Sequence, residues 1–372
     1  MIRLLHTADL HLGARFAALG EVEEERKRDF LATFSRLVDL AVERGVDLFL
    51  VCGDLFDLPR PDKALVAFVE GQLDRLVQAG ITPVLVPGTH DWQSGSDGIY
   101  GGRHFDGAIV LNRPEAVQVR VGKHDVWFYS HPPLVEPGPG LTEIMRRRTE
   151  EGLHIGLLHG SLRGSPEWDY RGRDLPFTLS DLAEWDLDYV ALGHYHRLQK
   201  LEAGERLFAC YPGSPEGKRF GEDGPRYALI VEVDTRRAGI EAVEVQQRQL
   251  RQESLILSAG MDEAAVASVV CERAGGRDLV RFTLEGTLDR VLDMETLWQR
   301  CRPAFFYLDL VDRTRWHDLD RLDRLALEET VRGEVVRRFL RLREHAETED
   351  AREEIDQALR EILVRFQCRE VS

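Results

Sequence analysis

The sequence predicts an α/β fold in which sheets are layered with helices. Short apolar runs alternate with amphipathic patterns along the first half of the chain, in the order expected of βαβαβ units. The composition agrees, because 43% hydrophobic and 31% charged residues are typical of a globular protein. The chain has 372 residues, and at roughly 100–200 residues per domain this length predicts two or three domains.

The first five predicted elements follow one another closely. An apolar run near the start predicts a strand, and a helical pattern follows in which Phe30, Phe34 and Leu37 share one face. Gly45 marks the end of this helix, and Gly80 marks the end of the second helix. In chain order, the elements are residues 2–6, 23–45, 47–53, 63–80 and 82–88.

Further apolar runs predict the remaining strands of the first domain, which we expect to cover residues 1–250. The first three resemble short strands of a mixed sheet, and the next two again end in His-containing turns. These runs are residues 108–111, 117–122, 125–130, 154–160, 186–196, 206–214, 226–234 and 239–250.

A smaller unit and a helical tail follow. Residues 253–312 repeat a compact βαβαβ pattern and predict a small α/β domain. Residues 316–372 show no strand signal and place apolar residues at helical spacing. One predicted helix face carries Ile355, Leu359, Ile362, Leu363 and Phe366, and another carries Val331, Val335, Phe339 and Leu342.

Charge and cysteine usage exclude several classes of protein. The formal net charge of −16 argues against nonspecific DNA binding through a uniformly basic surface, although a local basic groove stays compatible with it. The five cysteines form no CxxC pair, which indicates reduced thiols rather than a disulfide framework or a zinc knuckle. Because the first residues already predict a strand and no apolar run could span a bilayer, we expect a cytoplasmic protein without a membrane segment.

Potential metal ligands follow five of the predicted strands. In open α/β sheets, ligands bind beyond the carboxyl ends of the strands, so five such ends would form one pocket rich in His and Asp. Glycines beside these residues permit close approach of the backbone. The candidates are Asp9, His11, Asp54, Asp57, Thr89, His90, Asp91, His159, His194 and His196.

Each candidate has a simpler interpretation when it is taken alone. A single His at a strand end is usually structural, and an Asp after a strand is often a helix N-cap. The patterns D-x-H, G-D-x-x-D, G-x-H-D, H-G and G-H-x-H nevertheless occur in this order, each after an apolar strand. Because five chance occurrences are improbable, the set predicts a metal site.

The mixture of carboxylate and imidazole predicts the kind of metal. Such ligands favour manganese, iron or zinc over calcium or magnesium, and no thiolate lies in the motifs. A shared carboxylate could hold two divalent ions roughly 3.5–4 Å apart, the geometry of two-metal phosphoester cleavage. The sequence therefore predicts a two-metal phosphoesterase site.

The motifs resemble the calcineurin-like metallophosphoesterase superfamily and, within it, the SbcD-type DNA-repair nucleases. HTADLHLG, GDLFD, DYVALGHYHR and YPGSPE carry the resemblance, which extends less specifically to a DNA-capping domain over residues 253–312. The resemblance implies a four-layer αββα sandwich, a small α/β cap and a helical tail. It also implies a DNA exonuclease or endonuclease in double-strand-break repair, with two divalent ions, manganese being favoured and iron or zinc possible.

The resemblance assigns ligands to two metal ions. The first ion would be held by Asp9, His11, Asp54 and His196. The second would share Asp54 as a bridging ligand and would also be held by Thr89, His159 and His194.

Three further residues have implied roles in catalysis. His90 would stabilise the scissile phosphate or protonate the leaving oxygen, which suits an imidazole because it exchanges protons near neutral pH. Asp91 would orient His90, with a helix N-cap as an equally open alternative. Asp57 would be an outer partner of the ligands or a turn residue, and we favour the former.

Thr89 departs from the family motif, which usually has Asn as the ligand at this position. The shorter, branched hydroxyl side chain can coordinate only if the backbone moves closer or a water intervenes. We therefore hypothesise a weaker second metal site. A Thr natural to this subfamily and an engineered residue are the competing explanations.

The expected partners are DNA, an SMC-like coiled-coil ATPase and a second copy of the chain. Phosphate contacts dominate DNA affinity, and Arg163, Arg171 and Arg173 follow the His159 motif closely enough to supply them, although a solvated loop is as compatible. The apolar stripes of the tail must be buried, either within the chain or, as we favour, against the ATPase.

Two other functions stay open. A phosphomonoesterase or a cyclic-nucleotide phosphodiesterase could use the same metal core, although the extra cap and tail argue against both. A DNA-end-binding subunit whose catalysis is weakened by Thr89 is the second alternative.

Overall fold

The computed structural model divides the chain into two compact units, Met1–Leu250 and Arg251–Ser372. The first unit ends where the sequence places the end of the first domain, whereas the predicted cap and tail together form the second unit. The structure describes residues 1–93, 98–101, 105–133, 140–167, 175–203, 206–288, 291–316 and 319–367.

One six-stranded sheet of the first unit is mainly parallel. Its order is β14 (Arg237–Glu244), β13 (Tyr227–Asp234), β1 (Ile2–Thr7), β2 (Leu48–Cys52), β3 (Thr82–Val86) and β4 (Ile109–Val110). Strands β1 to β4 are parallel to one another, with His6 opposite Leu50, whereas β13 pairs antiparallel with both β1 and β14.

A second six-stranded sheet has four parallel strands at its centre. Its order is β11 (Gln199–Ala203), β12 (Arg206–Tyr211), β10 (Tyr189–Gly193), β7 (Leu153–His159), β6 (His124–Ser130) and β5 (Glu115–Val121). The two edge strands β5 and β11 are antiparallel to their neighbours. Two short strands, β8 (Ser161–Leu162) and β9 (Pro176–Phe177), pair separately.

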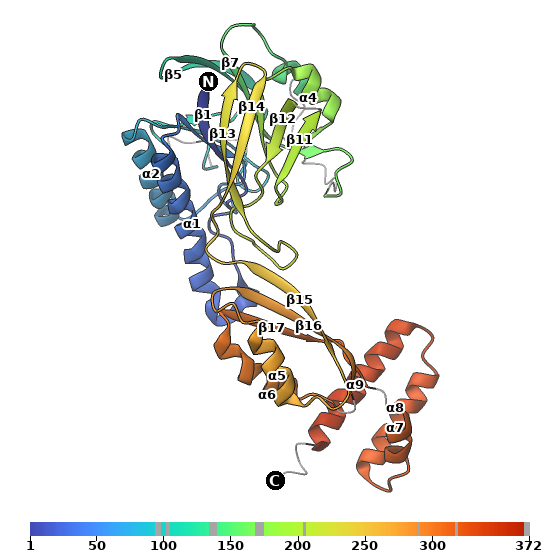
Figure 1. Ribbon diagram of the computed structural model, residues 1–372. Coiled ribbons are helices and arrows are strands. Elements are labelled where there is room, and N and C mark those ends of the chain that lie inside the picture. The colour runs from blue at the N-terminus through green and yellow to red at the C-terminus, as the bar shows by residue number, and fades with distance from the viewer. Residues whose placement is uncertain are drawn as a thin grey trace. The chain divides into compact units, whose positions relative to one another are not determined.

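Helices cover the outer face of each sheet, which confirms the predicted four-layer αββα fold (Figure 1). Residues of α1 (Glu23–Arg44) and α2 (Lys63–Gln78) pack on the first sheet, and a short 3-10 helix, η1 (Ala17–Val22), precedes α1. Residues of α3 (Leu141–Met145) and α4 (Leu179–Trp185) pack on the second sheet. These two short helices were not predicted from the sequence.

Strand β2 is apolar throughout because both of its faces are buried. In β2, Leu48 and Leu50 face the core between the two sheets, whereas Phe49 and Val51 face the core under α1 and α2. A strand of alternating polarity would leave charged side chains in one of these cores. The continuous apolar runs in the sequence therefore specify a layered sheet rather than one that faces solvent.

The two sheets approach each other closely where β2 and β10 end. A Cβ atom added at Gly193 would lie 1.8 Å from the carbonyl oxygen of Cys52. One added at Gly53 would lie 2.1 Å from His159 Nδ1. Only glycine fits at these two positions, which bring the carboxyl ends of both sheets together.

The second unit contains a four-stranded sheet with helices on one face. The strands are β15 (Leu250–Leu257), β16 (Leu279–Leu288), β17 (Tyr307–Asp312) and β18 (Arg315–Trp316). Residues of α5 (Glu263–Glu272) and α6 (Met294–Cys301), which is followed by the 3-10 helix η2 (Arg302–Ala304), complete an apolar core. Strand β18 reaches Trp316, the first residue of the tail for which the sequence predicted no strand.

The tail forms three helices, α7 (Leu319–Ala326), α8 (Val331–Glu344) and α9 (Glu349–Gln367). Leu359 and Leu363 of α9 are buried with Val336 of α8, so part of the predicted apolar surface is covered within the tail. Val331 is 73% exposed and Leu342 is 52% exposed, so another part of this apolar surface stays exposed. None of the helices in the described ranges is both long and apolar enough to span a bilayer.

Candidate metal centre

The predicted ligands meet because five strand ends converge. Strands β1, β2 and β3 of the first sheet and β7 and β10 of the second all end at the same place, and each is followed by candidate ligands. Five of these side chains are no more than 2% exposed, namely Asp9, His11, Asp54, Asp91 and His159. Burying so many ionisable groups together is costly unless something neutralises them.

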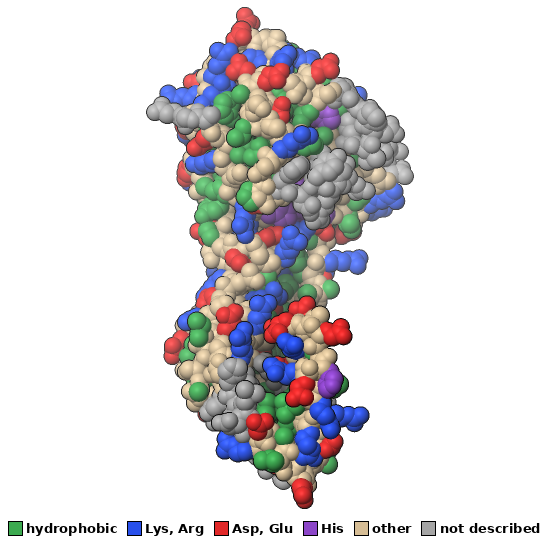
Figure 2. Space-filling model, turned by 90° about the vertical axis from the view of Figure 1, so that its right-hand side faces the viewer, with side chains coloured by type: hydrophobic (Ala, Val, Ile, Leu, Met, Phe, Trp, Pro, Cys, Tyr) green, Lys and Arg blue, Asp and Glu red, His purple; other side chains and the backbone are tan. Residues whose placement is uncertain are grey.

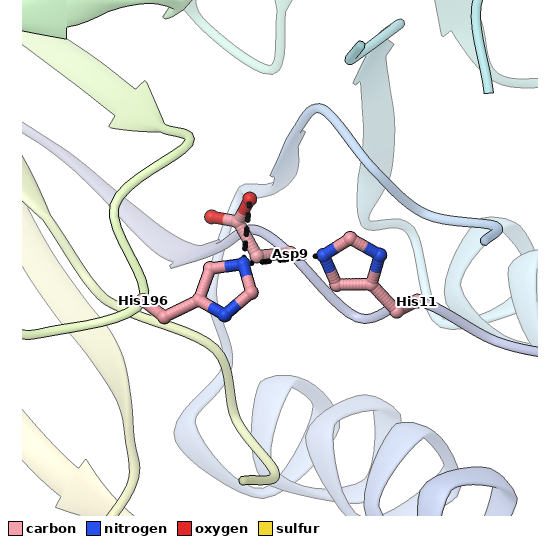
Figure 3. A group of neighbouring side chains, drawn as sticks. All are labelled: Asp9, His11 and His196. Atoms are coloured by element: carbon pink, nitrogen blue, oxygen red, sulfur yellow. Dashed lines mark hydrogen bonds and ion pairs between the residues drawn. The ribbon is translucent and has the colours of Figure 1, made fainter. Parts of the chain in front are cut away.

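Three groups of side chains have ligand atoms within 4.8 Å of one another in the described part of the chain. The groups are Asp9, His11 and His196; Asp9, Asp54 and His159; and His11, Asp57 and His90. Figure 3 shows the His11 and His196 rings pointing toward each other beside Asp9. Their Nε2 atoms are 3.2 Å apart, and His196 Nε2 is 3.9 Å from Asp9 Oδ1.

Asp54 belongs to the second group and also approaches the first. Its Oδ2 atom is 3.7 Å from His11 Nε2 and 3.5 Å from His159 Nε2. A carboxylate in this position could contribute to two metal ions, and the bridging role of Asp54 stays a prediction.

Three histidines are oriented by an acceptor at Nδ1. His11 Nδ1 is 3.1 Å from Asp57 Oδ1, and His196 Nδ1 is 3.0 Å from Glu222 Oε1. His159 Nδ1 is 3.0 Å from the carbonyl oxygen of Cys52. Ionised carboxylates and carbonyls only accept hydrogen bonds, so these contacts place the donated proton on Nδ1 and leave Nε2 as a possible metal ligand.

The residues present fit a divalent transition-metal ion. His159 Nε2 is buried and has no hydrogen-bond partner among the described residues. With their protons on Nδ1, His11 and His196 direct two Nε2 lone pairs at each other, an arrangement that a cation stabilises. Imidazole nitrogens together with carboxylate oxygens are ligands suited to manganese, iron or zinc.

The backbone is strained at the candidate ligands. Seven non-glycine residues in the described ranges have positive φ angles, and four of them are candidate ligands. Those four are Asp9 (53°), His11 (46°), Asp54 (49°) and His194 (108°). Positive φ is unfavourable for residues with a Cβ atom and is concentrated at functional sites, so the strain marks this region independently of residue type.

The clustered charges shift the pKa values of the ligands. Burial raises the pKa of Asp9, although His159 and His196 oppose it. Burial would also raise the pKa of Asp54, but the nearby histidines, first His159 and then His11, bring it below its ordinary value. Burial, and then the charge of His159, lower the pKa of His194 to about 3, so this ring stays neutral and able to bind metal.

His194 and Thr89, which were predicted to complete the second metal site, lie close to residues of the second group, although His194 belongs to none of the three groups found among the described residues. The backbone N–H of His194 donates to both carboxylate oxygens of Asp9, at 3.1 and 3.0 Å, and its ring lies edge-on to His159 with centroids 5.2 Å apart. Thr89 is half-buried in the turn before His90, whose backbone N–H donates to Asp54 Oδ1 at 2.8 Å. The residue after Thr89 thus contacts the Asp54 carboxylate, which is predicted to bridge the two ions.

His90 is the accessible histidine at the mouth of the site. Its side chain is 47% exposed, and its ring is perpendicular to His11 with centroids 4.7 Å apart. His90 Nδ1 is 3.3 Å from the carbonyl oxygen of Asp57, which leaves Nε2 directed elsewhere. Asp57 thus contacts both His90 and His11, and its favoured role as an outer partner of metal ligands stays a prediction.

Asp91 differs from its predicted role. Its carboxylate accepts hydrogen bonds from the backbone N–H groups of Gly88 and Phe56, at 2.7 and 3.2 Å, and from the hydroxyl of Tyr100 at 2.9 Å. Burial, and then the charge of Asp54, raise the pKa of Asp91 to about 7. These contacts fix the loop that carries His90, whereas no hydrogen bond found among the described residues joins Asp91 to the His90 ring.

Two residues at the site were not predicted as such. Glu222 accepts from His196, and Lys218 Nζ donates to Asp57 Oδ1 at 2.8 Å. Glu222 was not identified from the sequence, because it follows no strand directly and belongs to none of the ligand patterns. The nearest signal was the motif YPGSPE, which ends just before Lys218.

The predicted DNA contacts are only partly within the described residues. Arg163 is exposed just after β8, and its backbone N–H donates to the carbonyl of Phe177 at 2.8 Å. Arg171 and Arg173 lie outside the described residues. A contact between this segment and DNA stays a prediction.

Comparison with known proteins identifies similar phosphoesterases. The family model described as calcineurin-like phosphoesterase matches residues 2–198. The uncharacterized metallophosphoesterase YhaO of Bacillus subtilis is 30% identical over 255 residues, which is 62% of this chain and 57% of that protein.

Archaeal proteins named DNA double-strand break repair protein Mre11 are also similar. The one from Sulfurisphaera tokodaii is 31% identical over 224 residues, or 58% of this chain and 54% of that protein. The one from Sulfolobus acidocaldarius is 26% identical over 303 residues, which is 77% of this chain and 76% of that protein. The chain thus spans somewhat more than half the length of YhaO and of the Sulfurisphaera tokodaii protein.

Proposed function

The chain belongs to the calcineurin-like phosphoesterase family, and from this premise we propose that it is a metal-dependent nuclease that hydrolyses phosphodiester bonds in DNA. The observation that carries the proposal is the convergence of Asp9, His11, Asp54, His159 and His196, with their metal-binding atoms directed at one another. The names of the Mre11 relatives favour DNA as the substrate and double-strand-break repair as the setting.

In this proposal two divalent ions share Asp54. Asp9, His11 and His196 would hold one of them, while His159, His194 and Thr89 would hold the other. We favour manganese, with iron or zinc as alternatives. When bound, such ions supply Lewis acidity, which activates water and offsets the negative charge of the phosphate.

The proposed task of His90 is proton transfer at the leaving oxygen. The Asp57 carbonyl accepts a hydrogen bond from His90 Nδ1, so Nε2 is available to a substrate. Because the ring is exposed while the ligands below it are buried, a phosphodiester at the ligands would contact His90 without further rearrangement. Asp57 would keep the ring in this orientation.

A comparison of substrates tests the proposal. The parent protein and His90→Ala are incubated with manganese and with end-labelled duplex DNA, single-stranded DNA, para-nitrophenyl phosphate monoester and diester, and a cyclic nucleotide. We expect the parent protein, but not His90→Ala, to cleave DNA, and we expect the parent to cleave the small diester more slowly than DNA. Faster cleavage of the monoester or the cyclic nucleotide than of DNA would show that the substrate is a small molecule. DNA binding without cleavage would favour a DNA-end-binding subunit with weakened catalysis.

We also propose that DNA reaches the site through local positive charge. On the first unit, Figure 2 shows histidine side chains at the surface with lysine and arginine side chains beside them. Such charges could contact phosphates even though the net charge of the chain is −16. Charge reversal at Arg171 and Arg173 should weaken DNA binding and reduce its salt dependence, and unchanged binding would exclude this segment.

The tail supports a further part of the proposal, which is docking onto the coiled coil of an SMC-like ATPase. Leu327 is 81% exposed, and with Val331 and Leu342 it leaves apolar surface uncovered by the tail. Changing these three residues to Ser should abolish co-purification with the ATPase while leaving cleavage of a small diester intact. A homodimer is proposed as well and is tested by analytical ultracentrifugation of the parent protein.

A further inference from the structure

A five-residue turn beside the candidate metal centre contacts one histidine of a ligand group directly and the other through a carboxylate. The turn comprises residues 218–222 and follows β12 of the second sheet. Glu222 at its end contacts His196, and Lys218 at its start contacts Asp57, the partner of His11. His11 and His196 are also the two rings whose Nε2 atoms lie 3.2 Å apart.

Glu222 is held so that both carboxylate oxygens have a defined partner. Oε1 accepts from His196 Nδ1 at 3.0 Å, and Oε2 accepts from the backbone N–H of Lys218 at 2.8 Å. Arg226 donates to the carbonyl oxygen of His196 at 2.6 Å and to that of Glu222. Since Glu222 is only 6% exposed, these contacts fix both the ring and the main chain of His196.

Lys218 extends the same support to His11. Its Nζ donates to Asp57 Oδ1 at 2.8 Å, and the same oxygen accepts from His11 Nδ1 at 3.1 Å. Lys218 therefore restricts the carboxylate that orients His11. Through Glu222 and Lys218, one short turn determines the orientation of two ligands that are 185 residues apart.

The turn is itself anchored to α1. Arg26, which is 1% exposed, donates to the carbonyl of Gly217 at 2.8 Å and pairs with Glu216 at 2.7 Å. Thr33 Oγ1 also donates to Glu216 Oε1 at 2.7 Å. The residues preceding Lys218 are thus connected to a 22-residue helix, which limits their movement.

The second ligand group has a different kind of support. His159 Nδ1 donates to a neutral backbone carbonyl, that of Cys52. Carboxylates make the coordinated imidazole a stronger donor and resist its rotation, and outer partners of this kind typically contribute 10–100-fold to metal affinity. The two groups should therefore differ in their affinity for the same ion.

We propose that Glu222 and Lys218 are positioning residues that make the Asp9, His11 and His196 group the tighter of two metal-binding sites. The proposal rests on the proposed function only in requiring that the centre bind divalent ions. It does not depend on DNA being the substrate.

The test measures how the metal-free protein, with all 372 residues, binds manganese. Calorimetry and electron paramagnetic resonance are the two measurements. The parent should show two classes of site. Glu222→Ala should weaken the tighter class about 10–100-fold and change the weaker class little. The manganese affinity of the tighter class in Glu222→Gln should lie between that of the parent and that of Glu222→Ala. The amide oxygen of Gln can still accept a hydrogen bond from His196, but its NH2 group cannot accept one from the backbone N–H of Lys218.

Asp223→Asn is the matched control, because it removes the same charge from the next residue and should leave both classes within about twofold of the parent. Lys218→Met should weaken the tighter class by about tenfold or less, since it acts on His11 through Asp57. A purely structural role would instead lower the melting temperature of the metal-free protein while leaving manganese affinity unchanged.

The outcomes separate this proposal from the proposed function. Manganese affinity within twofold of the parent in Glu222→Ala, or a loss confined to the weaker class, would overturn the positioning role. If Glu222→Ala does not fold, Glu222→Gln and Lys218→Met decide the question by the same criterion. A parent that binds manganese as predicted but cleaves no DNA would overturn the DNA substrate and leave the positioning role standing.

Discussion

The two units of the chain both layer parallel strands with helices, yet they place charge differently. In the first unit, ionisable side chains are buried where strands end, and all three ligand groups found across the described ranges lie there. In the second unit, charges pair across a partly exposed sheet face, as Arg281 does with Asp309 at 2.6 Å. Layering therefore provides a scaffold, and the residues after the strands decide whether a site forms.

The largest effect should come from removing the carboxylate charge of Asp54, which approaches His11 of one ligand group and His159 of another. Asp54→Asn keeps the shape of the side chain but weakens binding of both ions. We expect phosphodiesterase activity to fall by at least about 10³-fold, because bound metal ions supply several kcal/mol of transition-state stabilisation. Metal content and turnover of a small diester are the measurements, and chelator-treated parent protein is the control. Activity within tenfold of the parent would contradict the central position of Asp54.

His90→Ala should give the next largest effect, about 10²–10³-fold on turnover, as expected when a general acid is lost. Since His90 is exposed and lies outside the two buried groups, manganese binding should stay close to that of the parent. Turnover and binding are measured on the same preparation. Equal losses in both would make His90 a ligand rather than a proton donor.

Lowering the pH should weaken metal binding in the first unit by about 10–100-fold between pH 7.5 and pH 5.5. Burial opposes the effect, but Asp54 and Asp9 raise the pKa of His159, and Glu222 and Asp9 raise that of His196. Raised pKa values keep the rings protonated to higher pH, and metal binds only the neutral rings, so affinity must fall as the solution becomes more acidic. Calorimetry in buffers of different ionisation enthalpy should record proton release on binding, and pH-independent affinity would argue against imidazole ligands.

Thr89→Asn tests the single departure from the family motif. A carboxamide oxygen reaches farther than the threonine hydroxyl, so we expect up to about tenfold tighter binding at the weaker manganese site, or about 1.4 kcal/mol. Metal occupancy and nuclease rate are compared with those of the parent. No gain in either quantity would mean that Thr89 is an adequate occupant of this turn.

The smallest effect should come from the second unit. Arg281→Ala breaks a partly exposed ion pair, so the free energy of unfolding should change by less than about 1 kcal/mol and manganese binding should not change. Chemical denaturation and calorimetry are the measurements. A loss of metal affinity in this variant would show that the second unit affects metal binding in the first.

Much of the fold could be predicted from the sequence because its signals are local. Leu48 to Cys52 are continuously apolar, as a strand buried on both faces must be, and Gly45 ends α1 in a left-handed conformation. The short helices α3 and α4 escaped prediction, because five and seven residues are too few to establish a helical period.

The sequence by itself determined which residues are candidates for the metal centre, because Asp9, His11, Asp54, His159 and His196 each follow an apolar run. Only the tertiary structure decided what supports them. Glu222 and Lys218 reach the ligands from another part of the chain, and Asp91 turned its carboxylate to Gly88, Phe56 and Tyr100 instead of His90. Strand ends repeat a local pattern that parallel pairing brings together, whereas the direction of a side chain in a loop depends on hydrogen bonds between distant segments and leaves no periodic signal.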